Sequence, residues 1–249
     1  MASRAEIIDE AVLLLAGAES VLWTLGLSGI PLRRAQITAL SGLSNQVVLK
    51  ALARLANLSV LAPTEGLVFE ITPPELAADI RARITAGEEK RLREAFLAFA
   101  EGHPGFSADF RVAQLMGLGR FREAAALVLE IAALASKPLP ADRLSNAFRA
   151  VLAGLAGEDE RDLVLEEDLT LAWLEGPLEV LRPRELKLAA ETMAAAGLVN
   201  EKKERLDRIL PRVEAEFAAR AARRRFEKAQ STAAAAATSG EAAESEAEA

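Results

Sequence analysis

Hydrogen-bonding and basic side chains recur between residues 33 and 54, and they are the residue types in this chain best suited to recognition chemistry. Asn and Gln can contact adenine edges, whereas Lys and Arg can reach guanine or phosphate. No acidic residue occurs between Ser20 and Thr64, so nothing within that segment would repel a phosphate. We therefore expect duplex DNA contacts from Arg33, Arg34, Ser44, Asn45, Gln46, Lys50 and Arg54.

A helical scaffold is expected to position these side chains. The third expected helix carries an inward apolar stripe of Val48, Ala51, Leu52 and Leu55, spaced three and four residues apart. Before it, a Gly-Leu-Ser turn supplies a glycine for the left-handed conformation and a serine that can cap the helix. The expected elements are helices over 20–27, from after Pro31 to about Ser41, and over 45–57, then a small hairpin over 59–71.

This order of helix, helix, turn, helix and hairpin resembles a winged helix-turn-helix. In DNA-binding members the third helix enters the major groove, which would leave Arg33 and Arg34 to clamp the backbone from the second helix. A purely structural role stays open, because winged helices also serve as protein-interaction modules. The hairpin favours that role, since it carries Glu65 and Glu70 where a DNA-contacting wing usually carries Lys or Arg.

A second resemblance covers about residues 5–135 and rests on element order and apolar pattern. The run from Ser20-Val-Leu-Trp-Thr-Leu25 to Leu61, with segments 66–71 and 74–84, looks like the winged helix of STAND-class ATPases and MalT-like regulators. In that family the module packs against the ATPase domain rather than reading DNA, and helical repeats follow it. No G-x-x-x-x-G-K-[ST] motif of such an ATPase occurs in this sequence.

The repeats have a partial signature of their own. Gly119-Arg-Phe-Arg-Glu-Ala124 resembles the turn and second helix of a tetratricopeptide (TPR) repeat, with Leu115 and Val128 at suitable apolar positions. No convincing self-repeat of about 34 residues follows, so a generic helical bundle is the alternative. The expected fold is mostly α, with an N-terminal winged helix-turn-helix and a small β-hairpin, then a TPR-like helical array. The expected domains are 1–86, 87–230 and a disordered acidic tail over 231–249.

Catalytic and metal chemistry have little support in the composition. The chain has no Cys and one His, His103, which excludes thiolate nucleophiles, Cys-rich zinc sites and multi-His sites. Gly117–Arg122 begins like a phosphate loop but ends in Arg, and the acids between 158 and 168 are contiguous rather than spaced as calcium ligands. We therefore expect no enzyme, no catalytic residues, no metal and no cofactor.

Charge is unevenly distributed along the chain, whose formal net charge is −7. Acids dominate residues 158–179, whereas residues 202–228 hold ten basic and five acidic side chains. The low-charge stretch 11–32 is interrupted by Gly and Pro, which favours a buried helix pair over a membrane span. The absence of Cys fits a reducing cytoplasm.

These observations predict a cytoplasmic, non-catalytic regulator or adaptor. Its winged helix would bind double-stranded DNA, and its helical array would bind a protein partner. The alternative is a protein-only interaction scaffold that works with a separately encoded STAND-type ATPase. The identity of the partner, any effector and the oligomeric state stay open.

Overall fold

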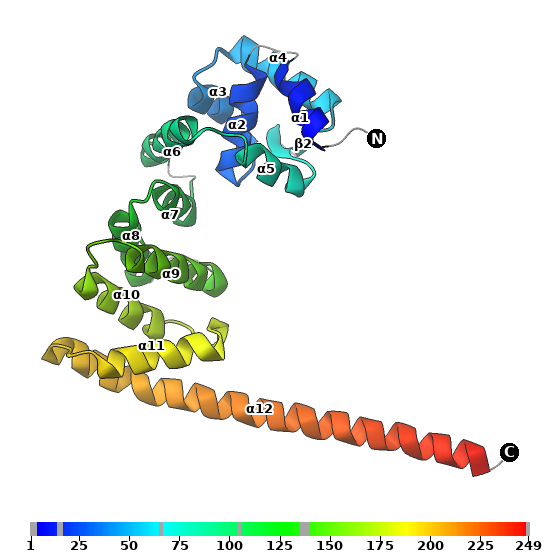
Figure 1. Ribbon diagram of the computed structural model, residues 1–249, viewed down its shortest axis with the longest axis vertical. Coiled ribbons are helices and arrows are strands. Elements are labelled where there is room, and N and C mark those ends of the chain that lie inside the picture. The colour runs from blue at the N-terminus through cyan, green and yellow to red at the C-terminus, as the bar shows by residue number, and fades with distance from the viewer. Residues whose placement is uncertain (1–3, 14–16, 65–66, 104–105, 135–139, 248–249) are drawn as a thin grey trace. The chain divides into compact units, whose positions relative to one another are not determined.

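The structure is a computed structural model, mostly helical with a small three-stranded sheet (Figure 1). The chain divides into two compact units, Met1–Ala124 and Ala125–Ala249. The division lies further along the chain than the domain boundary expected after residue 86. The structure describes residues 4–13, 17–64, 67–103, 106–134 and 140–247.

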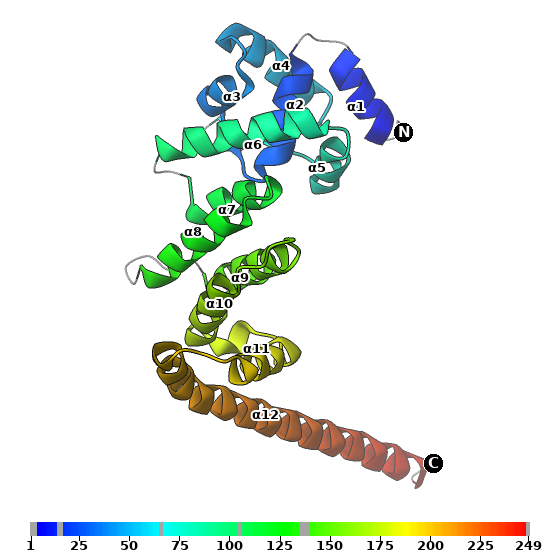
Figure 2. The same cartoon turned by 60° about the vertical axis from the view of Figure 1, so that its left-hand side comes forward.

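The N-terminal unit is built around one buried helix. Every residue of the stretch 21–28 is buried, which explains why the sequence carries so little charge there. The later helices α5 and α6 both pack against this helix, α2 (Figure 2). The unit contains α1 (Arg4–Leu13), α2 (Ala18–Ser28), β1 (Leu32–Arg33), α3 (Arg34–Ser41), α4 (Asn45–Asn57), β2 (Leu61–Thr64), β3 (Val68–Ile71), α5 (Pro74–Arg81), α6 (Ala86–Glu101) and α7 (Ala108–Gly117).

Close approach between α2 and α5 depends on a glycine. A Cβ built at Gly26 would lie 2.6 Å from Cγ2 of Ile80, a side chain that is fully buried. Only a residue without a side chain therefore fits this position while Ile80 keeps its place. Ile80 belongs to the same buried core as Leu22 of α2 and Leu76 of α5.

The sheet is antiparallel with the strand order β1-β3-β2. The strands β2 and β3 form the predicted hairpin, in which Leu61 lies opposite Ile71. The sequence did not predict β1, whose two residues pair with β3 and place Arg33 opposite Val68. Two residues are too few for a periodic pattern, so only the pairing itself identifies this strand.

In the C-terminal unit, α10 packs against α9, α11 and α12, and α11 packs against α12. The last helix packs through Leu206, Ile209 and Val213, as its apolar spacing predicts, whereas residues 221–232 are exposed. The expected acidic tail, 231–249, falls mostly on residues whose side chains lie outside the description. The elements are α8 (Phe121–Ala133), whose residues up to Ala124 belong to the N-terminal unit, α9 (Ala141–Ala156), α10 (Leu163–Glu175), η1 (Leu178–Val180), α11 (Pro183–Ala195) and α12 (Asn200–Ala247).

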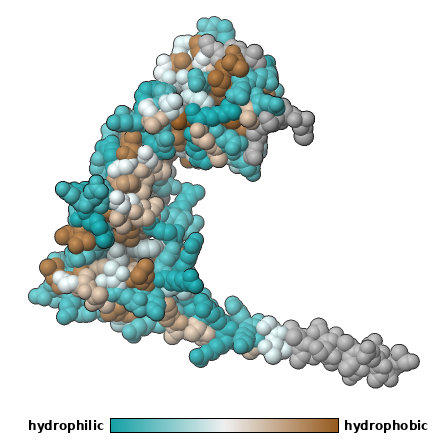
Figure 3. Space-filling view, in the orientation of Figure 1, coloured by the Kyte–Doolittle hydropathy of each residue, from teal (hydrophilic) through white to brown (hydrophobic). Residues whose placement is uncertain are grey.

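The surface is mixed in character. On the face drawn in Figure 3, hydrophobic residues form small separate groups among hydrophilic ones. Among the described residues, no helix is both long enough and apolar enough to cross a bilayer.

Candidate functional site

Helix α4 is held in place by a turn, a cap and a buried stripe. Gly42 ends α3 in the left-handed conformation at φ +70°, which favours glycine. The hydroxyl of Ser44 accepts the N–H of Val47 at 3.4 Å and so caps α4. Burial fixes the helix from the other side, because the stripe residues are all 0–2 % exposed: Val48, Ala51, Leu52 and Leu55.

The outward face of α4 carries most of the predicted recognition residues. Asn45, Gln46 and Lys50 are exposed, as is Ser44 at the cap. An apolar side chain also lies on this face, since Leu49 is 49 % exposed. The face therefore offers amides, one cation and one hydrophobic contact to a partner.

Arg54 pairs with an acid from α1, which would compete with a phosphate for its guanidinium. Its Nη2 lies 3.3 Å from Oε1 of Glu10, and the two side chains are 39 % and 50 % exposed. The segment from Ser20 to Thr64 contains no acidic residue. In the folded protein, however, Glu10 of α1 lies beside it. The sequence-based inference of an acid-free surface is therefore wrong at this end of α4.

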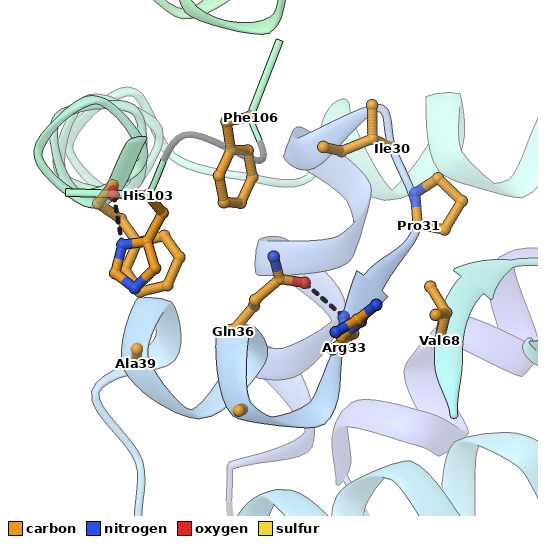
Figure 4. Close-up of a pocket in the computed structure, with 10 residues that line it drawn as sticks. Ile30, Pro31, Arg33, Gln36, Ala39, Val68, His103 and Phe106 are labelled. Atoms are coloured by element: carbon orange, nitrogen blue, oxygen red, sulfur yellow. Dashed lines mark hydrogen bonds between the residues drawn. The ribbon is translucent and has the colours of Figure 1, made fainter. Parts of the chain in front are cut away.

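The two consecutive arginines at the start of α3 have different surroundings. Both are exposed, and neither forms an ion pair in the described part of the chain. Arg33, however, lines a pocket to which no residue of α4 contributes (Figure 4). The seven predicted residues thus separate into four on the α4 face, a paired Arg54, an Arg33 that lines the pocket and an exposed Arg34 that belongs to neither group.

This pocket has a volume of about 700 Å³ and is lined by residues that are far apart in sequence. Its walls come from β1 and α3, from β3, and from the end of α6 with the residues after it. Sequence spacing could not reveal it, because only the packing of α6 on α3 brings its walls together. The lining residues are Ile30, Pro31, Arg33, Ala35, Gln36, Ala39, Val68, Phe99, His103 and Phe106.

His103 is part of this pocket and is stacked on an aromatic ring. Its imidazole lies parallel to the ring of Phe99 with centroids 3.8 Å apart. Its Nδ1 lies 2.8 Å from the carbonyl oxygen of Phe99. Since a carbonyl can only accept, Nδ1 carries the hydrogen and Nε2 is the nitrogen left for other contacts.

The β2–β3 hairpin presents an apolar residue. Leu67 is 69 % exposed and adopts φ +58°, an unusual conformation for leucine. Glu70 on β3 is exposed, whereas the predicted turn Glu65-Gly66 lies outside the described residues. The described residues of the hairpin hold no basic side chain that could reach a phosphate.

The acidic residues of α10, by contrast, form ion pairs with basic residues of α12 within the C-terminal unit. Lys202 of α12 lies 3.0 Å from a carboxylate oxygen of both Glu167 and Asp168, and Arg205 lies 2.8 Å from Glu175. The hydrogen bond from Arg205 holds the pKa of Glu175 below its ordinary value, against the effect of burial. In the part of the chain that the structure describes, no three carboxylates or histidines gather as a metal site would require.

A shallow groove runs between α11 and α12. One part, of about 450 Å³, is mainly apolar and includes Ala190, Ala194 and Val213. The adjoining part, of about 310 Å³, shares Lys187 and Phe217 with it and ends at Arg184, Arg220 and Arg224. The side chain of Arg220 is already used, since it pairs with Glu216 and donates to two carbonyl oxygens of the η1 region.

Comparison with known proteins gives no match for this chain: no family model fits it, and no curated protein or solved structure is significantly similar. Its function therefore has to be derived from its own residues and their arrangement.

Proposed function

We propose that the N-terminal unit is a winged helix-turn-helix module, with α4 as its recognition helix and β2–β3 as its wing, and that the protein is a non-catalytic regulator that binds duplex DNA. The observation that carries the proposal is the two-sided character of α4. Its inner stripe is fully buried, so the helix is rigidly held, while Asn45, Gln46 and Lys50 point outward from its first turns. Amide and amine groups on a fixed helix suit base edges and phosphates.

The charges around α4 limit how strong this binding can be. With Arg54 paired to Glu10, the cations left without an ion pair among the described residues of β1, α3 and α4 are Arg33, Arg34 and Lys50. Neutralising two or three phosphates predicts a slope of log K against log salt of about −2 to −3. We therefore expect weak binding that is measurable at low salt and lost at physiological salt unless base contacts add to it.

The test is fluorescence anisotropy with a labelled random duplex at two salt concentrations. Replacing Arg34 and Lys50 together by Ala should reduce affinity and flatten the salt dependence, since both side chains are exposed and Ala favours helix. A matched control replaces Arg81 on α5 and Lys90 on α6, two exposed cations away from α4, and should bind like the wild type. Equal binding by the two double variants, or no binding by the wild type at low salt, contradicts DNA recognition.

A protein partner at the same face is the second candidate, and two exposed leucines favour it. Leu49 and Leu67 expose apolar surface on the recognition helix and next to the wing turn, where DNA would meet phosphates. A separately encoded STAND-type ATPase is the partner class that the family resemblance suggests. We expect such a partner to co-purify with the wild type and with Lys50→Ala, and to be lost with Leu49→Glu. Retention by Leu49→Glu would contradict docking at α4.

The C-terminal unit supplies the second binding surface in this proposal, through the groove between α11 and α12. Its apolar floor and its basic end suit an amphipathic helix of a protein partner that places its acidic side chains at the basic end, away from Glu191 and Glu214 on the apolar part. Arg184 and Arg224 are exposed and have no ion pair among the residues described. Exchanging both for Glu should abolish partner binding, whereas the same change at exposed Arg143 of α9 and Arg182 before α11 should not.

A further inference from the structure

We propose that the pocket of the N-terminal unit binds a small organic anion, namely a carboxylate attached to an apolar or aromatic body, and that Arg33 holds the carboxylate. The site is separate from the outward face of α4. It therefore does not depend on whether α4 binds DNA, a protein or neither.

The size and the walls of the pocket define the body of the ligand. A volume of about 700 Å³ lies in the range of sites that hold small molecules. Ile30 and Val68 form apolar walls on the side of the sheet, and Phe99 and Phe106 form an aromatic wall on the side of α6. The rings of these two phenylalanines meet edge to face at 5.6 Å, so the aromatic wall is already ordered. A flat ring or a short acyl chain would bury apolar surface on both sides.

Arg33 supplies a guanidinium that has no carboxylate partner in the described structure. Its backbone is fixed, because it pairs with Val68 in the sheet and its N–H donates to Oε1 of Gln36 at 2.7 Å. The guanidinium at the pocket edge is exposed, which leaves its five N–H donors available to a ligand. A planar fork of donors matches a carboxylate in particular.

The other polar groups of the pocket agree with an acceptor-rich ligand. Because Oε1 of Gln36 is occupied by the backbone of Arg33, the group that Gln36 has left is its NH₂ donor (Figure 4). None of the ten lining residues is acidic, so among the described residues that line the pocket no fixed negative charge opposes the ligand. The pocket therefore combines one cation and one amide donor with apolar walls, which favours anions over cations and over neutral hydrocarbons.

The experiment uses 2-naphthoate as the probe and its neutral analogue, 2-naphthalenemethanol, as the comparison. His103 is the only histidine in the chain, so a single imidazole Hε1 resonance reports on the pocket in a proton NMR titration of the full chain. Calorimetry measures the affinity in parallel. We expect saturable naphthoate binding that shifts this resonance, and binding of the alcohol weaker by about tenfold or more, since the charge-assisted hydrogen bonds are lost.

Two neighbouring arginines provide a matched pair of variants. Arg33→Gln should weaken naphthoate binding by about tenfold or more, and Arg34→Gln, which makes the same change one residue away and outside the pocket, should leave it unchanged. Ala39→Phe, which fills the pocket and keeps Arg33, should abolish binding of both probes. Circular dichroism and the fluorescence melt of Trp23 establish that each variant is folded.

Three results would overturn the proposal. One is a His103 resonance that does not move at millimolar naphthoate, and another is equal affinity of Arg33→Gln and Arg34→Gln. The third is equal affinity for the acid and the alcohol, which would make the pocket an apolar site without anion recognition. The variant of Arg34 and Lys50 tests DNA binding only, because neither residue lines the pocket. The three results above therefore test the pocket whether or not the protein binds DNA.

Discussion

Both units join distant segments through ion pairs, and they differ in where the cations without an ion pair lie. In the C-terminal unit, basic side chains of α12 pair with acids of α10 that lie 30 or more residues earlier, as Arg205 does with Glu175. Arg149 and Glu185 join α9 to α11 in the same way. In the N-terminal unit, Arg54 and Arg83 pair with acids of α1 in the same way, whereas the cations at positions 33, 34 and 50, on β1, α3 and α4, have no ion pair among the residues described. Cations without an internal partner are available to a ligand, so the two proposed sites of the N-terminal unit involve these residues, as the proposed groove of the C-terminal unit involves Arg184 and Arg224.

The comparison can be tested because each unit holds one tryptophan. Trp23 lies in α2 and is 7 % exposed, and Trp173 lies in α10 and is 9 % exposed. The indole of Trp173 donates to Oγ of Ser145 at 3.1 Å. Single-tryptophan backgrounds, Trp173→Phe and Trp23→Phe, therefore report the unfolding of the N-terminal and C-terminal unit separately.

The largest effect is expected from Leu52→Ala in α4. Leu52 is 2 % exposed, and truncating its side chain leaves a cavity beneath α4. We expect a loss of about 2–5 kcal/mol in the unfolding free energy, measured by urea titration of Trp23 fluorescence. Leu49→Ala on the opposite face should change stability by less than about 0.5 kcal/mol. Similar losses for both leucines would mean that α4 is not held as described.

A smaller loss is expected at the contact between α2 and α5. Gly26→Ala places a methyl group 2.6 Å from Ile80 and should cost about 1–3 kcal/mol by overpacking. Gly87→Ala, in the first turn of α6, meets nothing within 4 Å and should be neutral or stabilising by up to about 1 kcal/mol. Thermal melts followed at Trp23 compare the two, and the same sign for both changes would contradict the close packing.

A loss of about 1 kcal/mol or less is expected when a link in the C-terminal unit is broken. Glu185 accepts from Arg149 at 2.7 Å and also from the backbone N–H of Arg182 at 3.0 Å, at the start of α11. Glu185→Gln keeps one oxygen for the backbone N–H of Arg182 but removes the charge and one of the two hydrogen bonds from Arg149, so the pair is broken while the helix cap is kept. The change should appear in the Trp173 melt. Unfolding measured at Trp23 should stay as in the parent.

The smallest effect concerns acid pH. Hydrogen bonds from Arg205 and Arg149 lower the pKa of Glu175 and of Glu185 from the ordinary value of 4.5. A folded-state pKa below the unfolded one gives stability that is present above pH 4.5 and is lost as the pH falls through the folded value. The Trp173 melting temperature should therefore fall below pH 4.5, and less steeply in Glu175→Gln. An identical slope in that variant would show that the Arg205 pair contributes nothing.

The N-terminal unit also contains a glutamate of lowered pKa, Glu88, which is hydrogen-bonded by Arg91 three residues later. A pair within one helical turn can persist in a partly helical unfolded chain, so its linkage to unfolding is weaker. The Trp23 melting temperature should thus depend less on acid pH than the Trp173 melting temperature.

Local patterns predicted a large part of the fold. The helix at 45–57 and the strands of the hairpin follow from periodicity and turn residues, and the structure gives α4 with those bounds. The mostly helical class is also confirmed. Such features depend on neighbours within a few residues, which is the range over which spacing carries information.

Contacts between distant segments could not be predicted in the same way. The strand β1 exists only through its pairing with β3, and the pocket exists only because α6 packs against α3. The acids of 158–179 and the bases of 202–228 stood out in the sequence as opposite runs. Their pairing across α10 and α12 depends on helix packing rather than on spacing.

The sequence by itself determined which faces of the helices are apolar, which residues can hydrogen-bond outward from α4, and that thiol and multi-histidine chemistry is absent from this chain. Only the tertiary structure decided which cations remain free. Arg54 is paired because α1 brings Glu10 beside it, and Arg33 faces a pocket because β3 and α6 close around α3. The physical reason is that periodicity fixes a side chain's direction on its own helix, whereas its partners depend on which elements pack against that helix.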